Sequence, residues 1–223
     1  MPRIARVAPG GLIQHVYNRG NGRMKLFRKP ADYDAFLNLL GEALDRVPGV
    51  RLLSYCLMPN HWHLVLWPTN VGELSGFMRW LSNTHVRRFR QHTVGQGHVY
   101  QGRFKSFPVQ EDRHLLLLMR YVEANPKRAK LVKQAEHWRW SSLTAARSPT
   151  GRKLLSPSPV TRSRNWLNKV NQPLDKPDLN AARQSLKRGR PLGETEWVNK
   201  TATTHGLTFT LRPLGRPKKV IKI

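Results

Sequence analysis

Two histidines flank a tryptophan at His61, Trp62 and His63, in a segment whose residue types favour a β-strand. Alternate side chains of a strand project from the same face, so the two imidazoles are expected to point together while Trp62 packs on the other side. Imidazole is a ligand for several divalent metals, including those that bind phosphates. The pair therefore predicts a metal site. The alternative is two ordinary polar residues on the solvent side of a strand.

Tyr121 lies on a helix that is predicted to begin near Glu111. A phenol oxygen can attack phosphorus when a cation neutralises the phosphate, and the product is a covalent phosphotyrosine. Asn125 follows one helical turn later, so its amide oxygen is placed to complete a site of two imidazoles and one amide, which suits Mg²⁺ or Mn²⁺. The alternatives are packing of Tyr121 in an apolar helix face and simple termination of the helix at Asn125-Pro126.

Strands and helices alternate around these residues. Strands are predicted at residues 14–20, 50–57, 61–67 and 98–109, and helices at residues 30–47, 72–91 and 111–125. The turn-forming pair Pro59-Asn60 separates two of the strands, which predicts an antiparallel hairpin. Strands interleaved with helices, together with a hairpin, indicate an α+β sandwich in which helices pack on a sheet.

Several motifs in the same order resemble those of the REP-associated tyrosine transposases, which belong to the single-tyrosine, His-hydrophobic-His (HUH) transposase superfamily. The motifs are CLMPNHWH (residues 56–63), YQGRFKS (100–106) and RYVEANP (120–126), with NRGN (18–21) and WRWSS (138–142) as further matches. The resemblance covers about residues 10–145. Several motifs at family-like spacing are far more specific than any one of them.

The resemblance implies a role for each motif residue. His61 and His63 are the implied metal-binding histidines, and Asn125 corresponds to the third, polar ligand. Tyr121 is the implied nucleophile, which cuts single-stranded DNA to give a 5′-phosphotyrosine and a free 3′-hydroxyl. The implied fold is a central antiparallel sheet with flanking helices, similar to a ferredoxin-like or RRM-like sandwich. The implied substrate is hairpin or palindromic repeat (REP-like) DNA, and the implied state is a monomer rather than a homodimer.

The chain is strongly basic, with 39 Lys and Arg against 13 Asp and Glu and a net charge of +26. A positive field of this size attracts polyanions and releases their condensed counterions, so nucleic acid is the predicted partner. Arg103 and Lys105 fall at alternate positions of the predicted strand and are expected on one face, with Phe104 on the other. The further candidates for DNA contact in this part of the chain are Arg19, Arg87 and Arg88.

A change in composition predicts two units, a catalytic domain at residues 1–148 and a basic DNA-binding extension at residues 149–223. The extension is rich in Pro, Lys and Arg, with short helices expected near residues 165–170, 179–186 and 195–204. Its segments RGRP (188–191) and GRPK (215–218) resemble a minor-groove hook, which when extended lays arginines into an A·T-rich groove. This predicts DNA contacts from Arg188, Arg190 and Arg216, with nonspecific phosphate contact as the alternative.

The sequence therefore predicts an enzyme, a metal-dependent single-strand DNA endonuclease and transposase. One alternative is a domesticated regulator that binds hairpins without cutting them, and another is a nuclease in which metal-bound water attacks directly. The single cysteine, Cys56, together with the absence of an apolar leader or membrane-length segment, predicts a cytoplasmic, nucleoid-associated protein. Neither a membrane partner nor a small-molecule substrate is expected.

Overall fold

A four-stranded antiparallel sheet forms the centre of the molecule in a computed structural model, which describes residues 9–93, 97–147 and 153–212. The strands are β1 (Ile13–Arg19), β2 (Val50–Met58), β3 (His61–Pro68) and β4 (Lys105–Val109), in the order β2-β3-β1-β4. β3 pairs with β2 through the tight turn at residues 59–60 and with β1 on its other edge. β3 is therefore an inner strand, and its two histidines lie close to the hairpin turn, His61 at the first residue of the strand and His63 two residues later.

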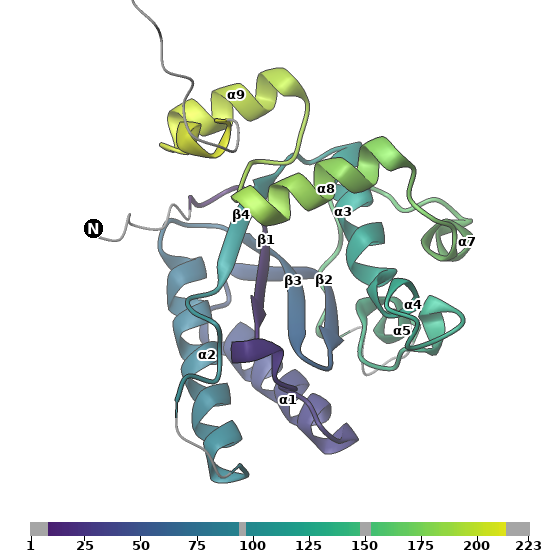
Figure 1. Ribbon diagram of the computed structural model, residues 1–223. Helices are drawn as coiled ribbons and strands as arrows, with labels where there is room; N and C mark the ends of the chain where they lie inside the picture. The colour runs from purple at the N-terminus through teal and green to yellow at the C-terminus, as the bar shows by residue number, and fades with distance from the viewer. Residues whose placement is uncertain (1–8, 94–96, 148–152, 213–223) are drawn as a thin grey trace, which may run out of the picture.

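Two long helices cover one face of the sheet, α1 (Pro30–Arg46) and α2 (Glu73–Gln91) (Figure 1). Pro30 begins α1, where a missing N–H has no cost, and the Asp32 carboxylate accepts from the backbone N–H of Lys29. Trp62 points to this side and is fully buried, as the alternation of the strand predicts. This layer packs against one face of β3, and the side chains of the two histidines project from the other face.

The opposite face carries a second layer of shorter helices. They are α3 (Arg113–Glu123), α4 (Asn125–Arg128), α5 (Ser142–Ala145), α7 (Trp166–Asn171) and α8 (Lys176–Arg188), while α9 (Thr195–Thr204) lies at one end of the molecule (Figure 1). Ile13, Val65 and Phe107 of the sheet pack with α3 in one buried cluster. The predicted α+β sandwich with a central antiparallel sheet is confirmed.

Two predicted elements are shorter than expected. The strand expected over residues 98–109 is formed only from Lys105 to Val109, and the residues before it are irregular apart from one bridge between Tyr100 and Gly20. The helix expected over residues 111–125 begins after Asp112, whose carboxylate caps the N–H of His114, and it ends at Glu123. Pro126 lies at the start of the next short helix, consistent with a proline in the first turn.

The segment after residue 148 contributes to the core. Trp166, Val170, Ala182 and Leu192 are buried in the same cluster as α3. Buried Glu123 at the end of α3 accepts hydrogen bonds from Trp166 Nε1 (2.8 Å) and Arg162 (3.0 Å), which ties α3 to this segment. Within the described ranges, no helix combines the length and apolar character that crossing a bilayer requires.

Candidate active site

His61 and His63 lie on the face of β3 that is turned toward α3. Nδ1 of His61 donates to Oδ1 of Asn60 (2.7 Å), and Nδ1 of His63 lies 3.0 Å from Nε2 of His15 on the neighbouring strand. Both Nδ1 atoms are therefore engaged, which leaves Nε2 of each ring to face a ligand. A histidine that binds a metal is usually oriented in this way, through a hydrogen bond to its second nitrogen.

Burial keeps both imidazoles neutral. Loss of hydration, followed by the positive charges of Arg19 and Arg128, lowers the pKa of His61 to about 4. The pKa of His63 lies well below its usual value, mainly because of burial and then because of the adjacent His15. A metal binds the neutral imidazole, so near pH 7 neither ring has to lose a proton before it can act as a ligand.

Tyr121 comes from α3 and meets the histidines across the interior. Its ring is edge-on to that of His63, with 6.3 Å between the ring centroids, and only 8% of the residue is exposed. The Arg128 guanidinium lies 4.0 Å from the centre of the phenol ring. A guanidinium over an aromatic ring is a favourable cation–π contact, so Arg128 helps to hold the ring of Tyr121 in place.

Asn125 lies at the start of α4 and lines the same cavity as Tyr121. Its Oδ1 accepts from the Arg128 guanidinium (2.7 Å), whereas its buried Nδ2 has no hydrogen-bond partner in the described part of the chain. The two imidazoles are of the neutral type that a divalent metal binds, with Nδ1 of each ring held by a neighbour. Asn125 fits as a third ligand only when its oxygen is released from Arg128, for example by rotation of the amide.

These residues surround a cavity of about 710 Å³. Arg19, Arg103 and Lys105, which the sequence singled out for DNA contact, all line it, although Arg103 precedes β4 rather than lying within it. Three further cations reach the cavity, Arg128 from α4 and Arg183 and Lys187 from α8. Its described lining includes no carboxylate that would neutralise these six cations, so the site attracts a polyanion.

The other basic residues predicted to contact DNA lie elsewhere. Arg87 and Arg88 are exposed on α2, outside the lining of this cavity. Arg188 ends α8, and its guanidinium donates to the carbonyl oxygen of Arg212 (2.7 Å), while Gly189 takes a left-handed conformation with φ 71°. The expectation of an extended segment is therefore wrong at Arg188 and Gly189, because the helix continues to Arg188. Arg190 follows and is half-buried, and Arg216 falls outside the described residues.

Three residues of the site carry no local sequence signal as strong as the histidine pair. They are His15, fully buried behind His63; Arg128, which contacts both Tyr121 and Asn125; and Tyr17, which lines the cavity and donates to the carbonyl oxygen of Leu186. His15 and Tyr17 alternate along β1, but only the pairing of β1 with β3 shows that they face His63. Tyr100 does not line this cavity. It is a buried packing residue whose hydroxyl contacts Trp62 and His85.

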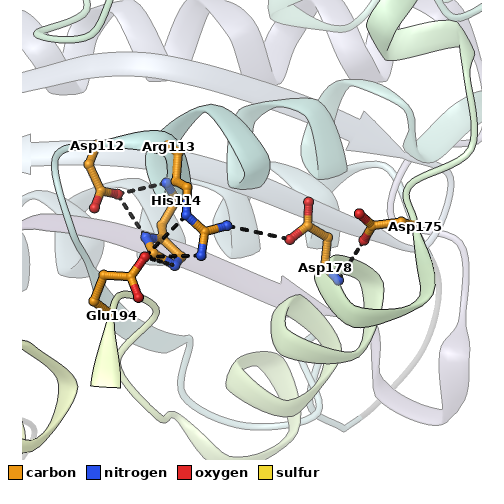
Figure 2. A network of polar contacts seen from close by, with 6 residues as sticks. All are labelled: Asp112, Arg113, His114, Asp175, Asp178 and Glu194. Carbon is orange, nitrogen blue, oxygen red and sulfur yellow. Dashed lines mark hydrogen bonds and ion pairs between the residues drawn. The ribbon is translucent and has the colours of Figure 1, made fainter. Parts of the chain in front are cut away.

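A second polar group lies away from this cavity, where α3, α8 and α9 meet (Figure 2). Asp112, His114 and Glu194 bring one ligand-type atom each within 4.8 Å of one another. Arg113 lies among them, however, and pairs with Glu194 (3.0 Å) and Asp178 (3.9 Å). Because an arginine already neutralises Glu194, the group serves as an ion-pair network that fastens α9 and α8 to the start of α3.

Solved protein structures include some that are similar to this chain. A solved structure described as a REP-associated tyrosine transposase bound to a REP hairpin is similar over 73% of this chain and 93% of its own, with 19% identity and a TM-score of 0.54. A putative transposase from Deinococcus radiodurans matches 55% of this chain and 96% of its own at 19% identity, with a TM-score of 0.39.

The first of these similarities shows that the two proteins share a fold, the one that the motif resemblance implies. No curated protein matches the chain. The model of the family described as "Transposase IS200 like" matches residues 11–125, a span that holds the two histidines, Tyr121 and Asn125. The chain belongs to the IS200-like transposase family.

Proposed function

We propose that the protein is a metal-dependent tyrosine nuclease and strand transferase that acts on single-stranded DNA, with Tyr121 as its nucleophile. One observation carries the proposal: Tyr121, His61 and His63 come from two distant segments and line a single cavity. A transposase must break and rejoin phosphodiester bonds, and a covalent phosphotyrosine conserves the energy of the broken bond for rejoining. The same cavity carries six cationic side chains to hold a phosphate backbone.

The chemistry follows from the side chains at the site. His61 and His63, with Asn125 when its oxygen is free, would hold a divalent ion such as Mg²⁺ or Mn²⁺, which when bound would supply polarisation of the phosphate. The Tyr121 oxygen forms a bond to phosphorus and gives up its proton, the bond from phosphorus to the 3′ oxygen breaks, and that oxygen takes up a proton and leaves as a 3′-hydroxyl, so that no proton is gained or lost overall. Arg128 helps to orient Tyr121 for this attack, since its guanidinium lies over the ring.

Hairpin or palindromic DNA is the substrate that we propose. The similar solved protein is described as bound to a REP hairpin. A hairpin offers single-stranded flanks at a defined distance from a duplex, and the cavity that would receive such a flank is walled by the sheet and by α3, α4 and α8. We propose that the protein acts as a monomer, because both histidines and the tyrosine are supplied by one chain.

The test is cleavage of a labelled hairpin oligonucleotide with single-stranded flanks in the presence of Mg²⁺ or Mn²⁺. The wild type is expected to give a free 3′-hydroxyl end and a covalent protein–DNA adduct that survives denaturation. Tyr121→Phe removes only the attacking oxygen, so it should abolish the adduct and retain hairpin binding. Tyr17→Phe is the matched control, because Tyr17 lines the same cavity, and it should still form adducts.

Two results would contradict the proposal in different ways. Cleavage that persists in Tyr121→Phe, without any adduct in the wild type, would indicate direct attack by metal-bound water. Tight hairpin binding that is unaffected by His61→Ala, with no cleavage by the wild type under any metal, would indicate a regulator that no longer cuts DNA.

A further inference from the structure

A second cavity, of about 620 Å³, lies between α2 and the segment that runs back from α2 toward β4. Figure 1 shows this segment rising alongside α2 before it enters the sheet. The described lining of this cavity does not include His61 or His63. Its lining combines side chains of α2 with those of residues 98–104.

The two cavities share one wall. Asn18, Gln101, Gly102 and Arg103 line both of them, and Gln101, Gly102 and Arg103 are exposed. The segment from Gln101 to Arg103 is therefore a low ridge between the cavities, with Tyr121 and the histidines on one side and α2 on the other. A chain-like ligand seated in the first cavity can pass over this ridge into the second.

The second cavity has the chemistry of a nucleotide site. Arg79, Arg90 and Arg103 supply positive charge, and the described lining contains no acidic residue to neutralise them. Met78 and Val86 provide an apolar surface, beside the polar side chain of Asn83. Apolar side chains beside polar and cationic ones suit an unstacked base with its phosphate.

A buried polar atom that lines the cavity also lacks a hydrogen-bond partner among the described residues. Ser82 lines the cavity, and its Oγ is shielded from solvent without a hydrogen-bond partner in the part of the chain that the structure describes. Buried hydroxyl groups are nearly always hydrogen-bonded in folded proteins, so one left unpaired beside a cavity is a natural contact for a ligand.

We propose that this second cavity binds the single-stranded segment that continues from the phosphodiester held beside Tyr121. The proposal rests on the proposed function, since it takes the first cavity as the place of cleavage. It adds a specific extension site, in which Arg79 contacts a phosphate and Asn83 faces a base. A duplex does not fit this role, because its bases are stacked and their faces are covered.

The experiment measures binding alone, with the Tyr121→Phe protein in metal-free buffer. Fluorescence anisotropy compares a hairpin without extensions, a hairpin with a 5′ single-stranded extension and a hairpin with a 3′ extension. One extension is expected to tighten binding. Arg79→Ala should weaken binding of that oligonucleotide and leave the plain hairpin unaffected. It should also reduce the slope of log affinity against log salt by about 0.7, the value for one phosphate contact to a single strand.

Arg87→Ala is the matched control, because Arg87 is exposed on the same helix, carries the same charge and lies outside both cavities. It should leave the advantage of the extended oligonucleotide intact. Asn83→Ala tests the base contact without a change of charge, and it should reduce affinity for the extended oligonucleotide at every salt concentration.

The inference is overturned if neither extension tightens binding, or if Arg79→Ala and Arg87→Ala reduce affinity equally for plain and extended hairpins. Failure of the proposed function is a separate result. It is recorded in the wild type with metal, as the absence of a covalent adduct, and leaves the binding comparison unchanged.

Discussion

At the scale of single residues, the candidate site depends on side chains that do not line the cavity but contact the histidines that do. His15 is fully buried, and among the residues that the structure describes its Nε2 makes a polar contact with Nδ1 of His63 (3.0 Å). Burial lowers the pKa of His15 to about 3, so it is neutral and its Nε2 can accept a hydrogen bond from His63. His15 therefore has the position of a residue that orients His63, and Asn60 has the same relation to His61.

This contact predicts the effect of substituting His15. His15→Phe keeps the aromatic packing against Phe107 but removes the acceptor, so the affinity for Mn²⁺ should fall about 10- to 100-fold, as is typical when a ligand histidine loses its partner. His15→Gln retains an acceptor and should recover part of the affinity. Titration of Mn²⁺ by calorimetry measures this without cleavage.

The matched control is His85→Gln, because His85 is also buried but contacts Tyr100 rather than a candidate ligand. It should leave Mn²⁺ affinity unchanged. If His15→Phe binds Mn²⁺ as tightly as the wild type does, His15 only fills space beneath the site.

At the scale of elements, the two helical layers are attached to the sheet by different means. α1 and α2 pack through apolar and aromatic side chains, with His85 of α2 buried against Phe36 and hydrogen-bonded to Tyr100 (2.8 Å). The layer on the other face depends more on buried polar contacts, above all those of Glu123 with Ser142 (2.7 Å), Trp166 and Arg162. Helix α3, which carries Tyr121, is therefore held through groups that need exact hydrogen-bond partners.

Acid should lower the stability of the fold through His85 of α2, which is buried. Burial lowers the pKa of His85 to about 4, whereas in the unfolded chain it is near 6.5. Between these values only the unfolded chain takes up the proton, so stability falls as the pH falls from 6.5 toward 4. The contribution is about 1.4 kcal/mol per pH unit, or roughly 2 kcal/mol at pH 5.

Urea unfolding at pH 7.5 and pH 5.0 checks this expectation. His85→Gln keeps a hydrogen-bonding side chain that does not titrate, so acidification should cost it about 2 kcal/mol less than the wild type. His98→Gln, at an exposed position, is the control and should behave like the wild type. Equal losses in the wild type and His85→Gln would show that His85 does not carry the acid sensitivity.

At the scale of the whole molecule, the segment after residue 148 is part of the candidate site as well as of the core. Arg183 and Lys187 of α8 line the cavity that holds Tyr121, and Tyr17 beneath them contacts Leu186. The division into a catalytic domain and a DNA-binding extension stays a prediction. α7 and α8 nevertheless contact α3. The segment after residue 148 therefore also supports the helix that carries Tyr121.

A chain ending at residue 148 is expected to lose cooperative folding. It would expose the face of α3 that Trp166, Val170 and Ala182 cover, and it would leave the buried Glu123 without two of its partners. A buried charge that loses its pair typically costs about 3–5 kcal/mol, a large share of the stability of a domain.

Thermal unfolding followed by circular dichroism provides the measurement. A chain ending at residue 212 is the control, because it retains every described residue of the C-terminal segment, and it should unfold near the temperature of the full chain. A cooperative transition at that same temperature for residues 1–148 alone would contradict the expectation.

The sequence by itself determined the local features of this protein: the shared face of His61 and His63, the long helices of the first layer, and the helical position of Tyr121. These follow from backbone periodicity, which acts over a few residues. Only the tertiary structure decided that His15 stands behind His63, that Arg128 covers Tyr121, and that α8 closes the cavity. Strand register and helix packing join segments far apart along the chain, so the contacts that fix them exist only after the sheet has assembled.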